Sequence, residues 1–347
     1  MFSLDASCQG QETSARGLFV SVIQEPPVLS SRQEIDHLIA FSKKARIKNL
    51  FVQIYRANQA WFPSKIGDSR PYQTCLKNVS EDSFALLIRE AHAAGIQVHA
   101  WLNLLSLSAN ADAPFLKKYG PQILTRNLKE KKTLEDYKID DQYFLEPGDL
   151  RVRRDLSALV EEIVRAYPDL DGVQFDYIRY PDLHPAYGYT QMNVGRFKKA
   201  TGLRTVEEES PVWKDWKRAQ VTGLLERLVK KARAIRPGIQ ISTTGLVPYS
   251  RANLEGFQDW RFWLGSGLVD FVTLMCYAPD VSGFERSLAD SKKHAGDLKK
   301  VNFAVGAYAL LDSPKIFKKQ FEMCEESGSR GCVVLGPFDS EPVYRVK

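Results

Sequence analysis

Long apolar runs are missing from this sequence of 347 residues. A helix that crosses a bilayer needs about 20 consecutive apolar residues, so we expect no transmembrane segment. A complete signal peptide is missing as well. The chain starts with the polar stretch MFSLDASCQGQETSARG, which predicts a flexible leader over residues 1–16. Cys8 follows Ala6-Ser7 in the manner of a lipoprotein cleavage site, but Asp5 stands where such a site has an apolar residue.

Cysteine and histidine are scarce, with five of each, and neither is grouped as metal ligands are. No C-x-x-C occurs, which argues against structural zinc. The sequence also has no glycine-rich dinucleotide fingerprint, no P-loop and no G-x-S-x-G elbow. We therefore expect neither a metal nor a cofactor. Cys324 and Cys332 straddle a helix-to-strand turn, where they can pair in an oxidising compartment or remain thiols.

Charge of one sign is not concentrated in any segment. The formal net charge is +6, and lysine pairs recur along the whole chain rather than on one element. A nucleic-acid-binding surface would cluster them, so we interpret the pairs as solvated helix faces and expect no nucleic-acid partner. The composition, 44% hydrophobic and 26% charged, is ordinary for a globular protein. We expect a monomer.

Strand-like and helix-like segments alternate along the chain, which predicts a parallel sheet with crossover helices. Eight segments read as strands: 18–23, 50–55, 96–103, 171–177, 239–245, 269–277, 302–308 and 332–338. Eight such strands close a barrel. We therefore predict an α/β fold, a single (β/α)8 TIM barrel over residues 17–347, without a second domain.

Helix ends and loop lengths complete this prediction. Ser80 is suited to cap a helix that ends at Gly95, and Asp149 is suited to cap another. The loops after the third and fourth strands are long (104–148 and 178–210), and we expect the first to cover the cleft. The segment after the last strand is too short for a full eighth helix, so the leader or another segment has to cover that gap.

The strand residues that face the barrel lumen are polar. Side chains alternate across a strand, and helices cover the outside of a barrel, so the apolar face points outward and the polar face inward. The inward set includes Gln97, His99, Trp101, Asn103, Gln174 and Asp176. Buried polar groups need hydrogen bonds or nearby solvent. This pattern favours an enzyme that binds a polar ligand.

Active sites of these barrels lie at the carboxyl ends of the strands, where acidic residues are candidates for chemistry. Asp176 ends the fourth strand; its alternatives are a turn cap or an ion pair with Arg179 or Arg56. Glu146 precedes the helix that leads into that strand, and its alternative is a capping or surface acid. Asp280 follows the sixth strand and is a third candidate for the site.

Aromatic side chains gather near the ends of six strands, a pattern that suits sugar rings, which stack on aromatic faces. The candidates for substrate binding are Trp61, Trp101, Tyr177, Tyr180 and Tyr277. Hydrogen-bond partners for sugar hydroxyl groups would be Arg56, His99, Asn103 and Gln174, and Arg179 and Asp280 are further candidates for substrate binding.

Several segments, taken in order, resemble the glycoside-hydrolase-like family 10 group of bacterial envelope lipoproteins. They are VQIYRANQAWFPS (52–64), GIQVHAWLN (95–103), YFLEPGDLRVRRDL (143–156), DGVQFDYIRYP (171–181) and QDWRFWLGSGLVDFVTLMCYAPD (258–280). The resemblance covers about residues 15–340. It implies a (β/α)8 barrel, glycosidase-type activity and an envelope glycan as substrate.

Carried across position by position, the resemblance implies a cleft formed by Arg56, Trp101, Asn103, Asp176, Tyr180 and Tyr277. This chain departs from the family pattern in two places. Glu146 stands where the pattern usually has Asp, and Ala57-Asn58 replaces a glycine-containing turn. A fainter likeness to chitinase-type barrels ends at Ile178, where their catalytic Glu would stand, so that chemistry is not supported.

Glycosidases generally use two carboxyl groups that flank the scissile bond. The sequence hypothesis is therefore a glycoside hydrolase of a bacterial cell-envelope polysaccharide, with peptidoglycan glycan strands as a candidate substrate. Asp176 would be the nucleophile or base and Glu146 the general acid. The alternatives are a non-catalytic glycan-binding protein, or a lyase or transglycosylase. An envelope substrate implies export to the periplasm or envelope.

Overall fold

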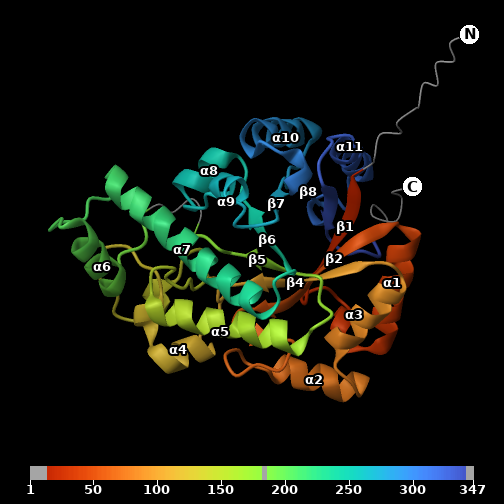
Figure 1. Cartoon of the computed structure of the whole chain (residues 1–347), viewed down its shortest axis with the longest axis horizontal. Coiled ribbons are helices and arrows are strands. Elements are labelled where there is room, and N and C mark those ends of the chain that lie inside the picture. The colour runs from red at the N-terminus through yellow and green to blue at the C-terminus, as the bar shows by residue number, and fades with distance from the viewer. Residues whose placement is uncertain (1–13, 182–185, 341–347) are drawn as a thin grey trace, which may run out of the picture.

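A computed structural model describes residues 14–181 and 186–340. Its centre is a closed barrel of eight parallel strands (Figure 1). In chain order they are β1 (Ala15–Val20), β2 (Ile47–Arg56), β4 (Gln97–Asn103), β5 (Gly172–Asp176), β6 (Gln240–Gly245), β7 (Phe271–Met275), β8 (Val301–Gly306) and β9 (Gly331–Leu335). Pairing of β1 with both β2 and β9 closes the ring. The single (β/α)8 barrel is thus confirmed.

Each of the eight predicted strands corresponds to one barrel strand. β1 begins at Ala15, inside the segment predicted as leader, and residues 1–13 of that leader lie outside the described residues. A two-residue strand, β3 (Gln59–Ala60), pairs antiparallel with the end of β2. This hairpin is an addition to the barrel.

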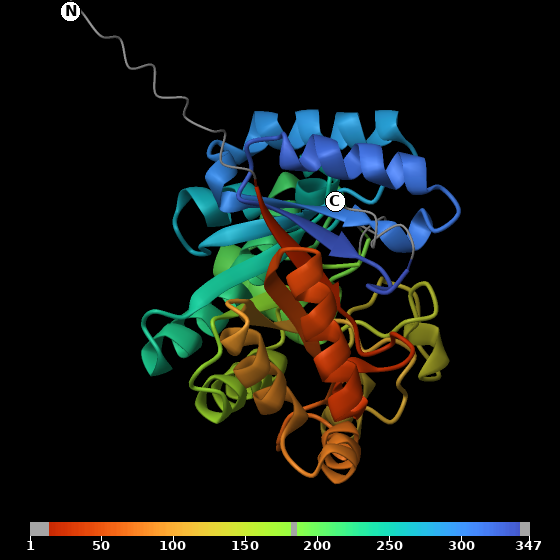
Figure 2. The same ribbon diagram turned by 90° about the vertical axis from the view of Figure 1, so that its right-hand side faces the viewer.

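Helices connect the strands and pack around them (Figures 1 and 2). They are α1 (Arg32–Lys44), α2 (Arg70–Val79), α3 (Ser83–Ala93), α4 (Pro114–Tyr119), α5 (Leu150–Ala166), α6 (Gln191–Thr201), α7 (Pro211–Ile235), α8 (Tyr249–Leu254), α9 (Trp260–Gly265), α10 (Val281–Ala295) and α11 (Pro314–Glu325). The long helices α5 and α7 lie side by side (Figure 1). No helix within residues 14–181 and 186–340 has the length and apolar character of a membrane span.

Of the two predicted helix caps, one is confirmed and the other is wrong. The side chain of Asp149 accepts hydrogen bonds from Arg151 N and Val152 N at the start of α5, as predicted. The prediction for Ser80 is wrong, because Ser80 is the left-handed residue that ends α2. Asp82 caps α3 instead, accepting from two backbone N–H groups. The expected helix is α3, which starts two residues later than predicted with the acidic side chain at its cap position, and α2 precedes it.

The long loop after β4 was predicted to cover the cleft, and this stays a prediction. Residues 104–148 are not part of the lining of the main cavity. They fold into α4, short bridges and turns, and they contact the site at Phe144, whose ring lies 6.4 Å from the Tyr177 ring, and at Leu104, whose N–H donates to Asp176 O. At the other end, the residues after β9 pack the buried Phe338 against His37 and Phe41 of α1. These contacts join the segment after β9 to α1.

The lumen is more mixed than the strand parity predicted. Apolar side chains on the outward strand faces pack against the helices as the main core. Inside the barrel, however, Phe19, Phe51 and Phe271 form a second apolar cluster below Trp101. Beside this aromatic floor, Ser242 Oγ and Thr273 Oγ1 both donate to the buried Gln174 Oε1. The lumen therefore combines aromatic packing with buried polar side chains that bond to one another.

Candidate functional site

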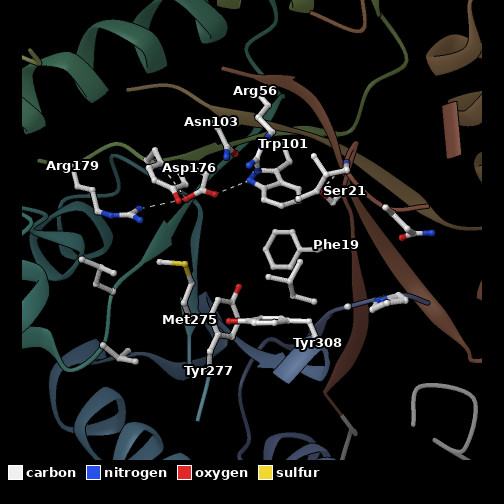
Figure 3. Close-up of a pocket in the computed structure, with 18 of the residues that line it drawn as sticks. Phe19, Ser21, Arg56, Trp101, Asn103, Asp176, Arg179, Met275, Tyr277 and Tyr308 are labelled. Atoms are coloured by element: carbon white, nitrogen blue, oxygen red, sulfur yellow. Dashed lines mark hydrogen bonds and ion pairs between the residues drawn. The ribbon is translucent and has the colours of Figure 1, made fainter. Parts of the chain in front are cut away.

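A cavity of about 920 Å³ opens at the carboxyl ends of the strands. This is the end at which (β/α)8 enzymes carry their active sites. Of the twelve side chains predicted for the site, seven line it: Arg56, Trp101, Asn103, Asp176, Tyr177, Arg179 and Tyr277. Figure 3 shows Arg56, Asn103, Trp101 and Asp176 along one side, with Met275, Tyr277 and Tyr308 facing them.

Asp176 is the most extensively bonded acid of the cavity and is only 4% exposed. Its Oδ2 accepts from Trp101 Nε1 at 2.9 Å. Its Oδ1 accepts from Thr244 Oγ1 at 2.5 Å and from the backbone N–H of Tyr177 at 2.7 Å, and Arg179 Nη1 lies 3.5 Å away. Among the described residues, Oδ1 thus has three donors and Oδ2 has one.

The chain turns sharply after Asp176. Tyr177 has a φ of 52°, the left-handed region that non-glycine residues rarely adopt. This conformation brings its N–H onto the Asp176 carboxylate and lets Arg179 return toward the same group. The Arg179 guanidinium lies 4.3 Å from the centre of the Tyr177 ring, an additional cation–π contact. The turn therefore shapes both the acid and the pocket wall beside it.

Hydrogen bonds between polar side chains stabilise the neighbouring wall of the cavity. Ser21 Oγ donates to Gln53 Oε1 at 3.0 Å, and Gln53 Nε2 donates to Asn103 Oδ1 at 3.1 Å. These residues come from the ends of β1, β2 and β4, so the relay crosses three neighbouring strands. Because its oxygen is occupied by Gln53, Asn103 is left with its N–H donors for a ligand.

Arg56 projects from the β2–β3 hairpin into the cavity lining. The two hairpin-loop residues, Ala57 and Asn58, are both left-handed, with φ of 54° and 59°. Asn58 stabilises this turn by donating to Tyr55 Oη and accepting from Phe115 N, which offsets the absence of glycine. Within the described chain, no hydrogen bond or ion pair engages the Arg56 side chain, so its donors are available to a ligand.

The opposite wall is aromatic and apolar. The rings of Tyr277 and Tyr308 meet edge to face at 5.7 Å, and Tyr308 is 49% exposed at the rim. Burial, and secondly the charge of Asp176, raise the pKa of Tyr277 well above its ordinary value. Tyr277 is therefore a neutral phenol facing a carboxylate. Phe19 lies between the two walls in Figure 3.

Glu146 does not line this cavity. Its side chain is fully buried, and its Oε1 accepts from Tyr180 Oη at 2.5 Å and from Gly148 N at 3.1 Å. Oε2 has no hydrogen-bond partner among the described residues. Burial raises the pKa of Glu146, an effect that the Tyr180 hydroxyl only partly opposes. The structure thus places this acid behind the loop that follows β5.

Four other predicted site residues also lie outside the lining. His99 is packed in the aromatic floor, its ring 4.9 Å from that of Phe51. Tyr180 is buried against Glu146, and Trp61 packs on the main core at the β2–β3 hairpin. Asp280 is exposed and caps α10, accepting from Gly283 N.

The sequence analysis missed one side of the cavity. β1 and its following loop contribute Phe19, Ser21, Ile23, Gln24 and Glu25, and the end of β9 contributes residues 335–337. The signal was available, because every barrel strand ends at the same face and Phe19 and Ser21 share parity in β1. Among the described residues, no three His, Cys, Asp or Glu side chains gather as a metal site requires.

The cavity at the carboxyl ends of the strands contains a hydrogen-bonded acid, side-chain amides and tyrosines. This arrangement is typical of (β/α)8 barrels that are enzymes. Residues 15–322 match the family Glycosyl hydrolase-like 10, and the chain belongs to that family. Membership confirms the resemblance and supports a glycosidase-type function.

Relatives of known name agree with this assignment. Glycosyl hydrolase DigH of Escherichia coli K12 is 24% identical over 324 residues, a match that covers 82% of this chain and 69% of DigH. Glycosyl hydrolase YngK of Bacillus subtilis is 23% identical over 277 residues, covering 72% of this chain and 50% of YngK.

Solved structures share the fold. The glycoside hydrolase domain of PgaB (BpsB) from Bordetella bronchiseptica has a TM-score of 0.72 at 16% identity, covering 96% of this chain and 98% of that one. The catalytic domain of β-amylase from Paenibacillus polymyxa has a TM-score of 0.57 at 11% identity, covering 96% and 95%. At these identities the likeness concerns the barrel alone.

Proposed function

We propose that the protein hydrolyses a bacterial cell-envelope glycan at the Asp176 cavity, with peptidoglycan glycan strands as the substrate. The observation that carries this proposal is the setting of Asp176. A carboxylate held by four donors stands in a large cavity, with tyrosine rings on the facing wall. Such a cavity matches the needs of a sugar chain, which presents both hydroxyl groups and apolar ring faces.

Two carboxyl groups belong to the described lining of the cavity, those of Asp176 and Glu25. Since glycosidases place one on each side of the scissile bond, Asp176 is the nucleophile or base and Glu25 the candidate acid. Glu25 is exposed on the loop after β1 and would be covered by bound substrate. Glu146, the acid predicted from the sequence, has no surface in the cavity from which to protonate a leaving group.

Arg56 supports a substrate that carries carboxylate groups. Its guanidinium faces the cavity, and those of Arg179 and Arg251 also belong to the lining, against only two carboxyl groups. Arginine binds carboxylates through paired hydrogen bonds. Peptidoglycan strands from which the peptides have been removed present such a group on each N-acetylmuramic acid residue, whereas chitin-type chains present none.

An extracytoplasmic location fits this substrate. Cys324 and Cys332 form a disulfide between α11 and β9, and disulfides persist mainly in oxidising compartments. We propose export to the periplasm or envelope. Fractionation of cells that express the full natural protein, with a cytoplasmic marker as control, tests the location.

The test of the activity is digestion of purified, peptide-free peptidoglycan strands, followed by reducing-end assay and mass spectrometry. Hydrolysis adds one water to each new product pair, and the wild type is expected to generate such ends. Asp176→Asn, which keeps shape and removes charge, should lower the rate by at least about 10³-fold. Equal rates for the folded variant and the wild type refute the role of Asp176. Products lacking the added water indicate a lyase or transglycosylase, and saturable binding without products a glycan-binding protein.

Arg56→Gln tests the substrate class. A hydrogen bond to a charged group contributes about 1.5–3 kcal/mol when its loss leaves the partner unpaired, so KM for carboxylated strands should rise about 10-fold or more. The same strands with the carboxyl groups reduced to alcohols serve as the matched substrate. The variant should lose the preference between the two, and an unchanged preference contradicts the assignment.

A further inference from the structure

A buried hydrogen-bonded cluster lies directly behind the wall that carries Asp176. Its members are Glu146, Tyr180 and Asn193, and we refer to these three residues as the brace. The Tyr180 hydroxyl donates to Glu146 Oε1 at 2.5 Å, and Asn193 Nδ2 lies 3.4 Å from the same hydroxyl. None of the three belongs to the cavity lining. Any influence of the brace on the reaction therefore passes through other residues.

The brace is fixed on its far side. Gly148 N donates to Glu146 Oε1 at 3.1 Å in the turn that leads into α5. Asn193, in α6, accepts at Oδ1 from Trp216 Nε1 of α7 at 2.9 Å. The α5 entry turn and α7 are thus linked to the Tyr180 hydroxyl through Glu146 and Asn193. All three brace side chains are less than 2% exposed, so water does not readily replace these bonds.

On its near side the brace holds the turn that aims Asp176. Tyr180 N donates to Gly256 O at 2.9 Å, so this residue is fixed at both backbone and hydroxyl. Between it and β5 lies Tyr177, whose left-handed backbone costs on the order of 1 kcal/mol and persists only where its surroundings hold it. The same turn positions Arg179 against the Asp176 carboxylate.

We infer that Glu146 and Tyr180 are positioning residues: the bond between them fixes the turn over residues 177–180 and, through it, the orientation of the Asp176 carboxylate. The inference rests on the proposed hydrolysis at Asp176 and gives Glu146 a role different from that of general acid. A general acid has to contact the leaving oxygen, whereas a positioning residue needs only a hydrogen-bond acceptor. The amide introduced by Glu146→Gln would supply that acceptor; an apolar side chain would not.

The kinetic test therefore compares Glu146→Gln with Glu146→Leu and Tyr180→Phe. Because misplacement of a reacting group by about 1 Å costs up to 10²-fold, Glu146→Leu and Tyr180→Phe should lower kcat about 10–100-fold with little change in KM. Glu146→Gln should stay within about threefold of wild type, on glycan strands and on activated aryl glycosides alike. An equal loss in Glu146→Gln and Glu146→Leu on the natural strands overturns the inference in favour of an acid role.

Tyr167→Phe is the matched control. The Tyr167 hydroxyl also donates to a partly buried carboxylate, Asp82 Oδ2 at 2.9 Å. This bond lies at the opposite end of α5 from the brace. The variant therefore loses the same kind of bond without touching the turn after β5. Its kcat should remain at the wild-type value even where its stability falls as much as that of Tyr180→Phe.

A second readout does not depend on activity. The Trp101 indole N–H donates to Asp176 Oδ2, so its proton–nitrogen NMR resonance reports the carboxylate position. It can be identified among the six tryptophans by comparison with Trp101→Phe. We expect it to shift in Glu146→Leu and Tyr180→Phe and to stay in place in Glu146→Gln and Tyr167→Phe. An unmoved resonance in Tyr180→Phe overturns the inference. If the wild type cleaves no glycan, the proposed function fails and this resonance alone decides the positioning role.

Discussion

His99 should make the stability of this barrel depend on pH in the mildly acidic range. The side chain is completely buried between Phe51 and Phe271, and neither ring nitrogen has a hydrogen-bond partner among the described residues. Burial lowers the pKa of His99 from 6.5 to about 4; Asp171 opposes this shift and Arg330 adds to it. The folded protein therefore keeps the imidazole neutral at pH values where the unfolded chain protonates it.

The size of the effect follows from this difference. Below pH 6.5 the unfolded state binds a proton that the folded state rejects, so the free energy of unfolding falls as the pH falls. With pKa values of 6.5 and about 4, the loss from His99 between pH 7.5 and pH 5 is about 2 kcal/mol. It levels off below pH 4 at roughly 3.4 kcal/mol, because each pH unit between the two pKa values contributes about 1.36 kcal/mol.

Urea unfolding at pH 7.5 and pH 5, for the wild type and for His99→Leu, measures this quantity. Leucine has a similar volume and does not titrate. Other groups contribute to the pH dependence of both proteins, so the difference between the two pH dependences isolates His99. We expect the wild type to lose about 2 kcal/mol more than the variant. Parallel pH dependences would show that the buried imidazole is protonated as easily in the folded as in the unfolded state, and would refute the argument.

Three further substitutions test the site and its support. Thr244→Val removes the 2.5 Å donor to Asp176 Oδ1 and should lower kcat roughly 10-fold in the strand-digestion assay; an unchanged kcat contradicts its role. Tyr308→Ala removes the half-exposed ring at the cavity rim and should raise KM for long glycan strands about 3- to 10-fold, whereas KM for an aryl monosaccharide should not change. Asp149→Ala removes the α5 cap and should lower the free energy of unfolding by about 1–2 kcal/mol; a loss under about 0.3 kcal/mol in urea titrations argues against the cap.

The barrel could be predicted because its signals are local and repeated. Each buried strand is marked by β-branched and aromatic residues, and strand parity correctly turned Asp176 and Gln174 toward the lumen. Strand parity does not, however, tell how far along the barrel axis a side chain lies. His99 and Trp101 share a face of β4, but two residues along a strand differ in height by about 6.6 Å. That distance puts Trp101 in the cavity and His99 in the floor beneath it.

Residues in loops were harder to place, because a loop has no parity. Glu146 and Tyr180 belong to the two family-like segments 143–156 and 171–181, the second of which contains Asp176. The direction of their side chains depends on contacts with distant parts of the chain. Tyr180 is held by Gly256, and Asn193 shares its hydroxyl. No pattern within either segment encodes those partners. The sequence thus identified segments that lie near the site. It could not tell which of their side chains line the cavity and which lie behind its wall.

The two carboxyl groups of the cavity differ in a way that suits the two halves of glycoside hydrolysis. Asp176 is buried and bonded through both oxygens, which fixes its orientation as a nucleophile or base requires. Its Oδ2 has a single donor among the described residues and therefore keeps a lone pair for the reacting carbon or water. Glu25 is exposed on the loop after β1 in the free protein, where a bound sugar chain would contact it. The fold thus fixes the orientation of one acid, whereas the other would meet a leaving group only when substrate occupies the cleft.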